Sequence, residues 1–236
     1  QGMAIETMQL SDALLQNPSV VEEIVGIPHG FDTDGIATDG IFIMFHRKLD
    51  NYPLMMKPDN WASYQNSGEI ADGVVVVEGG NILVVAPTEE SLYWSSAEVS
   101  AGGKTTTDRL TALDDWTGKA NTAVQIIHPE CSGENYAPGF CSKYSRPNAN
   151  GQGLTAGKWW LPSLGELMMI YANMNKINYA LSLINGATSL AKSGYWSSTE
   201  YTGRHGWALF PGNGIVGYYN KNTNQYGVRP VSAFIQ

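Results

Sequence analysis

Hydrophobic and polar positions follow different periods along the chain, and the clearest pattern lies in its first half. Residues 74–77 and 82–85 are two uninterrupted apolar runs separated by the turn-forming letters EGGN. Apolar runs joined by a glycine-containing turn are typical of a β-hairpin, and strands without polar alternation are buried on both faces. The pattern predicts a hairpin at the centre of the fold, and it predicts a further strand at 41–45.

Helical periodicity is strongest after Ser163. Ser163 and Glu166 have the spacing of a capping box, and apolar side chains follow at intervals of three and four residues. This predicts a helix that begins at the serine. Shorter helices are predicted within 119–129 and 177–186, which end in a proline and a glycine, respectively.

The two ends of the chain have different patterns. Residues 5–27 carry apolar periodicity interrupted by Asn-Pro, which predicts two short helices, whereas short aromatic and β-branched runs alternate with Gly/Asn turns after residue 194. Residues 95–118 are rich in turn-forming residues and predict a long surface loop. The chain is therefore predicted to be α+β, with an N-terminal helical arm (1–39) and a ligand-binding domain (40–236).

Composition narrows the classes of partner. The chain has 236 residues and a formal net charge of −8, and only 15% of its residues are charged, against roughly 25% in an average soluble protein. A negative balance repels phosphate backbones and anionic headgroups, so no nucleic acid partner is expected. No apolar run approaches the roughly 20 residues that a membrane-spanning helix needs, so no membrane insertion is expected.

The reactive residue types do not form a known catalytic motif. The four histidines are scattered, and neither cysteine has a Cys-x-x-Cys partner, so no metal and no cofactor are expected. Cys131 and Cys141 fit either a disulfide or two buried thiols. Asp32, Asp34 and Asp39 resemble part of a calcium loop but lack its terminal glutamate, and turn-forming Asp-Gly pairs also explain them.

The C-terminal stretch is unusual because its last 36 residues contain no Asp or Glu. A general acid/base carboxylate pair cannot be assembled within it. It contains many Tyr, Trp, Asn and Gly residues, which is the composition of recognition surfaces, although the aromatic residues also fit the core of a loop-rich β region. The best candidates for binding anchors are Arg204, Trp207, Tyr218 and Tyr219.

The chain contains two nearly identical hexapeptides. "YWSSAE" ends at Glu98 and "YWSSTE" ends at Glu200, but the sequences around the two copies do not match. A domain duplication is therefore not expected. The hypothesis is that Trp94 and Trp196 have similar packing roles in two strands that carry loops.

Three segments together resemble a known family. "WWLPSLGEL" from Trp159, "GYWSSTEY" from Gly194 and "YGVRPVSAF" from Tyr226 are similar to the C-type-lectin-fold domain found at the C-terminus of bacterial collagen-like adhesins. They are equally similar to the variable proteins of diversity-generating retroelements. The resemblance covers about 40–236 and implies a C-type-lectin-like fold, with twisted antiparallel sheets, flanking short helices and long loops.

The resemblance also implies roles for individual residues. It implies that Glu166 pairs with Arg229, and that 202–226 is a diversified region that displays the ligand-binding side chains. The implied ligand-binding residues are Thr202, Arg204, His205, Trp207, Leu209, Tyr218, Tyr219, Asn220, Thr223 and Gln225.

These features predict a non-enzymatic protein that binds a cell-surface protein or glycan. Its expected location is extracellular, on a bacterial surface or a phage virion, and the arm would join it to a homo-oligomer or a larger surface assembly. Two alternatives are a structural module of a surface fibre or virion and a relative of the formylglycine-generating enzymes. The C-terminal cysteine pair of those enzymes is missing here.

Overall fold

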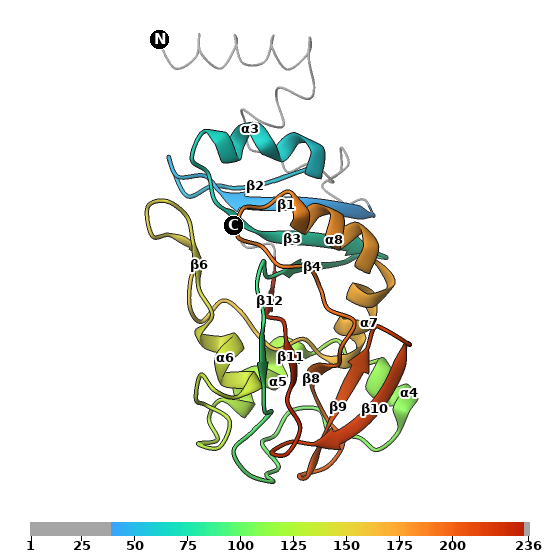
Figure 1. Cartoon of the computed structure of the whole chain (residues 1–236). Coiled ribbons are helices and arrows are strands. Elements are labelled where there is room, and N and C mark those ends of the chain that lie inside the picture. The colour runs from blue at the N-terminus through green and yellow to red at the C-terminus, as the bar shows by residue number, and fades with distance from the viewer. Residues whose placement is uncertain (1–38, 234–236) are drawn as a thin grey trace, which may run out of the picture.

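The computed structural model describes residues 39–233, which form two five-stranded sheets connected by short helices and long loops (Figure 1). The predicted helices of the N-terminal arm lie outside the described residues. The α+β class is confirmed.

The first sheet has the strand order β12-β4-β3-β1-β2 and lies in the upper half of Figure 1. Its strands are β1 (Gly40–His46), β2 (Pro53–Met56), β3 (Ala71–Glu78), β4 (Asn81–Val85) and β12 (Val231–Ser232). The predicted hairpin is β3–β4, and β3 is the central strand.

Both faces of this sheet are covered, which explains why its strands lack polar alternation. Val74 and Val76 of β3 face one core cluster, together with Ile43 of β1. Their neighbours Val75 and Val77 face a second cluster. The first cluster contains side chains of one helix that follows β2 and of the two helices that follow Ser163. These helices are α3 (Trp61–Asn66), α7 (Leu164–Ala172) and α8 (Met174–Ser182), and the 3-10 turn η1 (Pro58–Asn60) leads into α3.

Helix α7 begins as the sequence predicts. The Ser163 side chain accepts a hydrogen bond from the Glu166 amide, and the Glu166 carboxylate accepts one from the Ser163 amide, so the capping box is complete. Helix α8 ends at Ser182, four residues before Gly186, whose φ of +75° suits glycine. The helix therefore ends earlier than predicted, and the connection from Leu183 to Gly186 follows it.

The second sheet has the order β10-β9-β8-β11-β5 and lies below the first in Figure 1. Its strands are β5 (Glu90–Leu92), β8 (Tyr195–Glu200), β9 (His205–Phe210), β10 (Ile215–Asn220) and β11 (Tyr226–Val228). Strand β11 lies between β5, which directly precedes the first hexapeptide copy, and β8, which is the second copy.

The middle of the chain joins the sheets. The predicted loop 95–118 contains one short helix, α4 (Arg109–Leu113), and the predicted helix in 119–129 is α5 (Gly118–Gln125). Helix α6 (Ala137–Lys143) follows, and then a two-stranded ribbon of β6 (Arg146–Pro147) and β7 (Gly153–Leu154). A third core cluster, which contains Trp94 and Trp196, fills the space between the second sheet and these segments.

Candidate ligand-binding face

The β9–β10 hairpin lies at the edge of the second sheet, at the lower right of Figure 1. Its strands are in antiparallel register, with Tyr218 opposite Trp207 and Asn220 opposite His205. Three connections are close in sequence to these strands, namely 201–204, 211–214 and 221–225. The face formed by this hairpin and the 201–204 turn is called the hairpin face below.

Four rings form a cluster on the hairpin face. Tyr201 and Tyr218 stack with their ring centroids 3.8 Å apart and their planes 7° from parallel. The His205 and Trp207 rings meet Tyr218 nearly at right angles, at 5.6 Å and 5.9 Å. Tyr218 is nevertheless 46% exposed. An exposed ring held by three neighbours loses little conformational entropy when a ligand covers it.

A polar group lies beside this cluster. The Arg204 Nε and Asn220 Nδ2 atoms both donate to Oε1 of Glu98, at 2.8 Å and 2.9 Å. Thr202 stabilises the turn that carries the arginine, because its hydroxyl accepts hydrogen bonds from the amides of Arg204 and His205. The Glu98 and Arg204 side chains are 42% and 62% exposed, respectively, so this group presents both charges to solvent.

A buried ion pair lies at the end of β10. The Lys221 ammonium donates to Glu200 Oε2 at 2.8 Å and to the Val99 carbonyl at 2.7 Å, and it lies 4.3 Å from the Trp94 ring centroid. Both charged side chains are fully buried. Burial raises the pKa of Glu200 and lowers that of Lys221, while the attraction between the two groups opposes both shifts.

The two hexapeptide copies explain this arrangement. Glu98 and Glu200 are the last residues of the two copies, and they bind the adjacent residues Asn220 and Lys221. The tryptophans are reciprocal: the Trp94 indole donates to the Ser197 carbonyl and the Trp196 indole donates to the Leu92 carbonyl. Both tryptophans are fully buried, which agrees with the hypothesis of similar packing roles.

The predicted ligand-binding residues differ in exposure. Arg204, Tyr218, Thr223 and Gln225 are exposed, whereas Thr202, His205, Tyr219 and Asn220 are half-buried. These eight residues can contribute surface to a ligand, although they do not all lie on the same face.

Trp207 and Leu209 are each only 1% exposed, so the prediction that they contact a ligand is wrong for this structure. Both belong to the core cluster that includes α7, and the Trp207 indole donates to the Thr106 carbonyl. Alternation along β9 directs both side chains inward. Trp207 instead supports the stacked tyrosines.

Tyr219 lies on the other side of the hairpin from Tyr218, because adjacent residues of a strand point to opposite faces. Its ring packs against Phe210 and Tyr226, with centroids 5.2 Å and 5.3 Å away. The predicted anchors therefore do not form one patch: only Tyr218 and Arg204 belong to the hairpin face as exposed groups.

The predicted Glu166–Arg229 pair does not form. The Arg229 guanidinium donates to Glu89 at 2.9 Å and to backbone carbonyls, including those of Ala86 and Thr188. Glu166 accepts instead from the Ser163 amide and the Trp160 indole. Arg229 and Glu166 each have hydrogen-bond partners close to them in space, so neither side chain needs the other as a partner.

Sequence reasoning missed Glu98 and Tyr201 as members of the hairpin face. The repeat contained the relevant signal, because Glu98 occupies the position that Glu200 has in the other copy and Tyr201 directly follows the second copy. Only the fold shows that the loop after β5 returns to the end of β10.

The two cysteines are free thiols, and both are fully buried. Burial raises the pKa of Cys131 to about 12 and raises that of Cys141 well above its usual value. Among residues 39–233, no three His, Cys, Asp or Glu side chains cluster as metal ligands would. Of the three aspartates that resemble a calcium loop, only Asp39 is described, and it accepts a hydrogen bond from the Gly79 amide. No helix within the described part of the chain has the length and apolar character to cross a membrane.

Comparisons with known proteins assign no family. No protein-family model matches the chain, and no curated protein sequence matches it. One similar solved structure is a fimbrial protein from Bacteroides ovatus ATCC 8483, which is 15% identical with a TM-score of 0.42. The alignment covers 89% of this chain and 46% of that protein, so this chain spans less than half of the neighbour's length.

Proposed function

We propose that the protein is a non-enzymatic binding module that recognises a cell-surface protein or glycan through its hairpin face. The observation that carries this proposal is the Tyr218 ring, which is 46% exposed although it stacks on the half-buried Tyr201 and is held by Trp207 and His205. Aromatic anchors with a charged polar rim are the usual hot spots of recognition surfaces. The Glu98–Arg204–Asn220 group provides this rim.

Several features support binding over catalysis. An enzyme based on a reactive cysteine needs an accessible thiolate, whereas burial keeps both thiols here in the protonated form. The carboxylates nearest the hairpin face form hydrogen bonds to fixed partners, since Glu200 binds Lys221 and Glu98 binds Arg204.

We further propose a C-type-lectin-like fold for residues 40–236, on the basis of the sequence resemblance. In this proposal the hairpin face is the diversified region of a variable protein or adhesin, displayed extracellularly on a bacterial or phage surface. The support from the structure is an arrangement in which surface side chains are separate from the groups that hold the fold. Arg204 and Tyr218 can change without disturbing the buried Lys221–Glu200 pair.

Binding can be tested with arrays of glycans and of bacterial surface proteins. The full chain should give specific signals that the Tyr218→Ser and Arg204→Ala variants each weaken at least about tenfold, because truncating a hot-spot residue costs about 2 kcal/mol or more and about 1.4 kcal/mol corresponds to a factor of ten. Tyr52→Ser is the matched control, because Tyr52 is a similarly exposed tyrosine at 37% and it lies before β2. Equal loss in all three variants, or in the control alone, would contradict the proposal.

Diversification is tested by sequencing the gene from natural isolates. Substitutions should concentrate at exposed positions of 202–226 such as Arg204, Tyr218 and Thr223, and the buried positions Trp207 and Lys221 should stay constant. An invariant hairpin face would favour the alternative, a structural module of a surface fibre or virion.

A further inference from the structure

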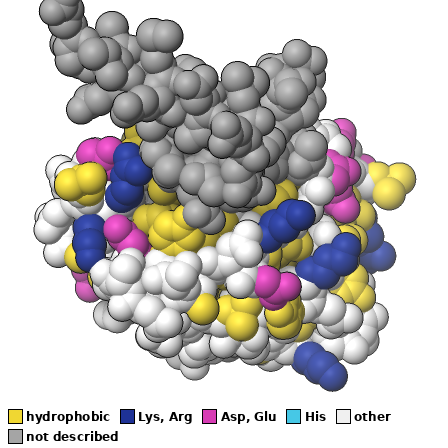
Figure 2. All heavy atoms as spheres, turned by 90° about the horizontal axis from the view of Figure 1, so that it is seen from above, with side chains coloured by type: hydrophobic (Ala, Val, Ile, Leu, Met, Phe, Trp, Pro, Cys, Tyr) yellow, Lys and Arg dark blue, Asp and Glu magenta, His cyan; other side chains and the backbone are white. Residues whose placement is uncertain are grey.

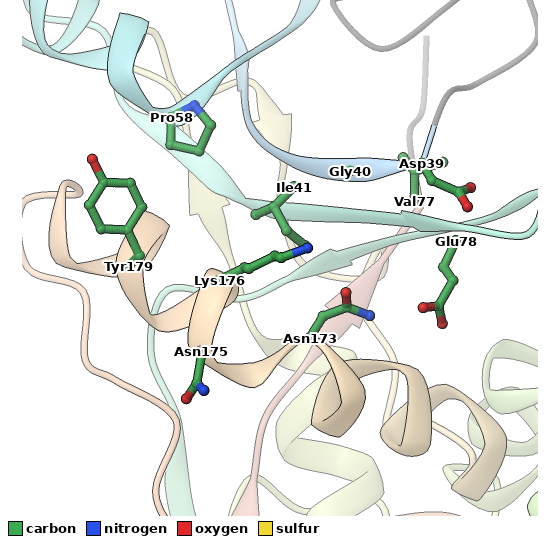
Figure 3. Close-up of a pocket in the computed structure, with 10 residues that line it drawn as sticks. All are labelled: Asp39, Gly40, Ile41, Pro58, Val77, Glu78, Asn173, Asn175, Lys176 and Tyr179. Atoms are coloured by element: carbon green, nitrogen blue, oxygen red, sulfur yellow. The ribbon is translucent and has the colours of Figure 1, made fainter.

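A second surface is hollowed around the first turn of α8, and it reaches the β9–β10 connection at Pro211 and Gly212. One hollow of about 690 Å³ lies between this helix, the start of β1 and the end of β3, and its lining includes Asp39, Ile41, Val77, Lys176 and Tyr179. Figure 3 shows Lys176 extending from α8 toward Ile41, with Tyr179 on one side and Asp39 and Glu78 on the other. The hollow therefore has apolar side chains and a cation at its centre and two carboxylates at one end.

A second hollow of about 730 Å³ continues on the other side of the same turn. The two hollows share Asn173, Asn175 and Lys176, and together they form one groove, called the α8 groove below. The second hollow is lined by Lys192 as well as Lys176 and by no carboxylate. Neither lysine forms an ion pair within residues 39–233.

Two lysines that have no ion-pair partner in the described part of the chain, beside a hollow lined by no carboxylate, stand out in a chain whose net charge is −8. In Figure 2, which views the molecule from above, exposed hydrophobic side chains lie among basic and acidic ones. A polypeptide that brings both carboxylates and apolar side chains complements such a surface, since its charges meet the lysines while its apolar groups leave water.

Residues 1–38 have this composition. They contain six Asp and Glu residues and no Lys or Arg, so they account for most of the negative balance of the chain. They also join the rest of the chain at Asp39, which itself lines the α8 groove. Asp34 and Asp32 precede it by five and seven residues, so an extended chain places them up to about 17 Å and about 24 Å from Asp39.

We propose that the α8 groove is the docking site of the chain's own residues 1–38, with Asp32 and Asp34 paired with Lys176 and Lys192. Asp39 and Glu78 occupy the end where the segment enters, so carboxylates of the segment are directed toward the lysine end. Ile36 is the large apolar residue between them and Asp39, and in this proposal it packs against Ile41 and Val77 of the groove. The docking does not depend on the function of the hairpin face.

The test is zero-length carbodiimide crosslinking of the full chain at low ionic strength, followed by peptide mass spectrometry. Amide links should join Lys176 or Lys192 to Asp32 or Asp34. Lys143, an exposed lysine in the last turn of α6, is the matched control and should give no such link. A mixture of ¹⁴N- and ¹⁵N-labelled chains should give links within one chain and few mixed ones.

Removing the positive charges of the groove tests the same contact between the lysines and residues 1–38. Lys176→Gln with Lys192→Gln should speed hydrogen exchange of the amides in 29–38 several-fold, whereas Lys143→Gln should leave it unchanged. The proposal fails if the lysines of the groove give no links to residues 1–38. It also fails if the links are mostly between differently labelled chains, because the occupant is then a second copy.

Discussion

At the residue scale, the most informative groups are the charged side chains buried without exposure to water. Glu200 and Lys221 satisfy each other, and Glu200 also accepts hydrogen bonds from the Ala101 amide and the Gln125 side chain. Glu166 has no cationic partner among residues 39–233 and depends on the Ser163 amide and the Trp160 indole. The two carboxyl groups should therefore respond differently to substitution and to pH.

Glu166→Gln should flatten the dependence of stability on pH. Burial raises the pKa of Glu166 to about 7 from an ordinary value of 4.5. The folded state binds this proton more tightly than the unfolded state, so the contribution of this group to stability is greatest below pH 4.5 and is lost as pH rises to about 7. The fall attributable to this group is up to about 3 kcal/mol. Urea unfolding of the original protein and the variant at pH 5 and pH 8 measures how much the free energy of unfolding of each changes between the two pH values. Equal changes in the two proteins would show that burial does not hinder the ionisation of Glu166.

Removing one member of the Lys221–Glu200 pair should be costly. Lys221→Met leaves a buried carboxylate without its cation and is expected to lower the free energy of unfolding by about 3–5 kcal/mol. Adding Glu200→Gln removes the stranded charge and should restore part of this loss. Chemical unfolding of the two single variants and the double variant measures the coupling energy between Lys221 and Glu200. Strictly additive changes in the free energy of unfolding would show that the two side chains are not coupled.

At the scale of elements, the β9–β10 hairpin contributes side chains both to the hydrophobic core and to the exposed surface. Trp207 faces inward from β9, while Tyr218 lies opposite it on β10 and remains exposed at the sheet edge. The same pairing that fixes the tryptophan in the core also fixes the tyrosine stack above it. A sequence of closely spaced aromatic residues does not reveal which member is buried.

Trp207→Ala and Tyr218→Ala should therefore have different consequences. The first deletes a side chain that is 1% exposed and is expected to cost about 3–5 kcal/mol of stability. The second removes a half-exposed ring and should cost less than about 1.5 kcal/mol, the contribution of an aromatic pair. Denaturant titration compares them, and similar losses would mean that Tyr218 is part of the core.

At the scale of the whole molecule, the two sheets are joined by buried groups that come from distant parts of the chain. Arg229 connects β11–β12 to the segments around Ala86 and Thr188. Within the second sheet, the indoles of Trp94 and Trp196 connect β8 with β5 and the residues that follow β5. Unfolding should therefore expose the third core cluster, which contains both cysteines, in one step.

The cysteines provide a measurement of this cooperativity. In native protein, Cys131 and Cys141 should react with a thiol reagent far more slowly than free cysteine, because both are buried and protonated. Across a denaturant titration, both should become reactive at the midpoint seen by tryptophan fluorescence. One thiol that reacts rapidly in native protein would contradict the packing described here.

The sequence by itself determined the local elements. The apolar runs around EGGN gave the central hairpin, and the Ser163–Glu166 spacing gave the capped start of α7, because turns and caps depend on residues that are close together along the chain. It also singled out the repeated hexapeptide and most of the exposed residues of the hairpin face.

Only the tertiary structure decided which distant groups meet. It paired Arg229 with Glu89 and not with Glu166, buried Trp207 and Leu209, and brought Glu98 to Arg204 across more than a hundred residues. Several carboxylates were available to each cation, and the geometry of the sheets selected among them. Pairing and burial depend on how the sheets and loops pack in space, which spacing along one chain does not specify.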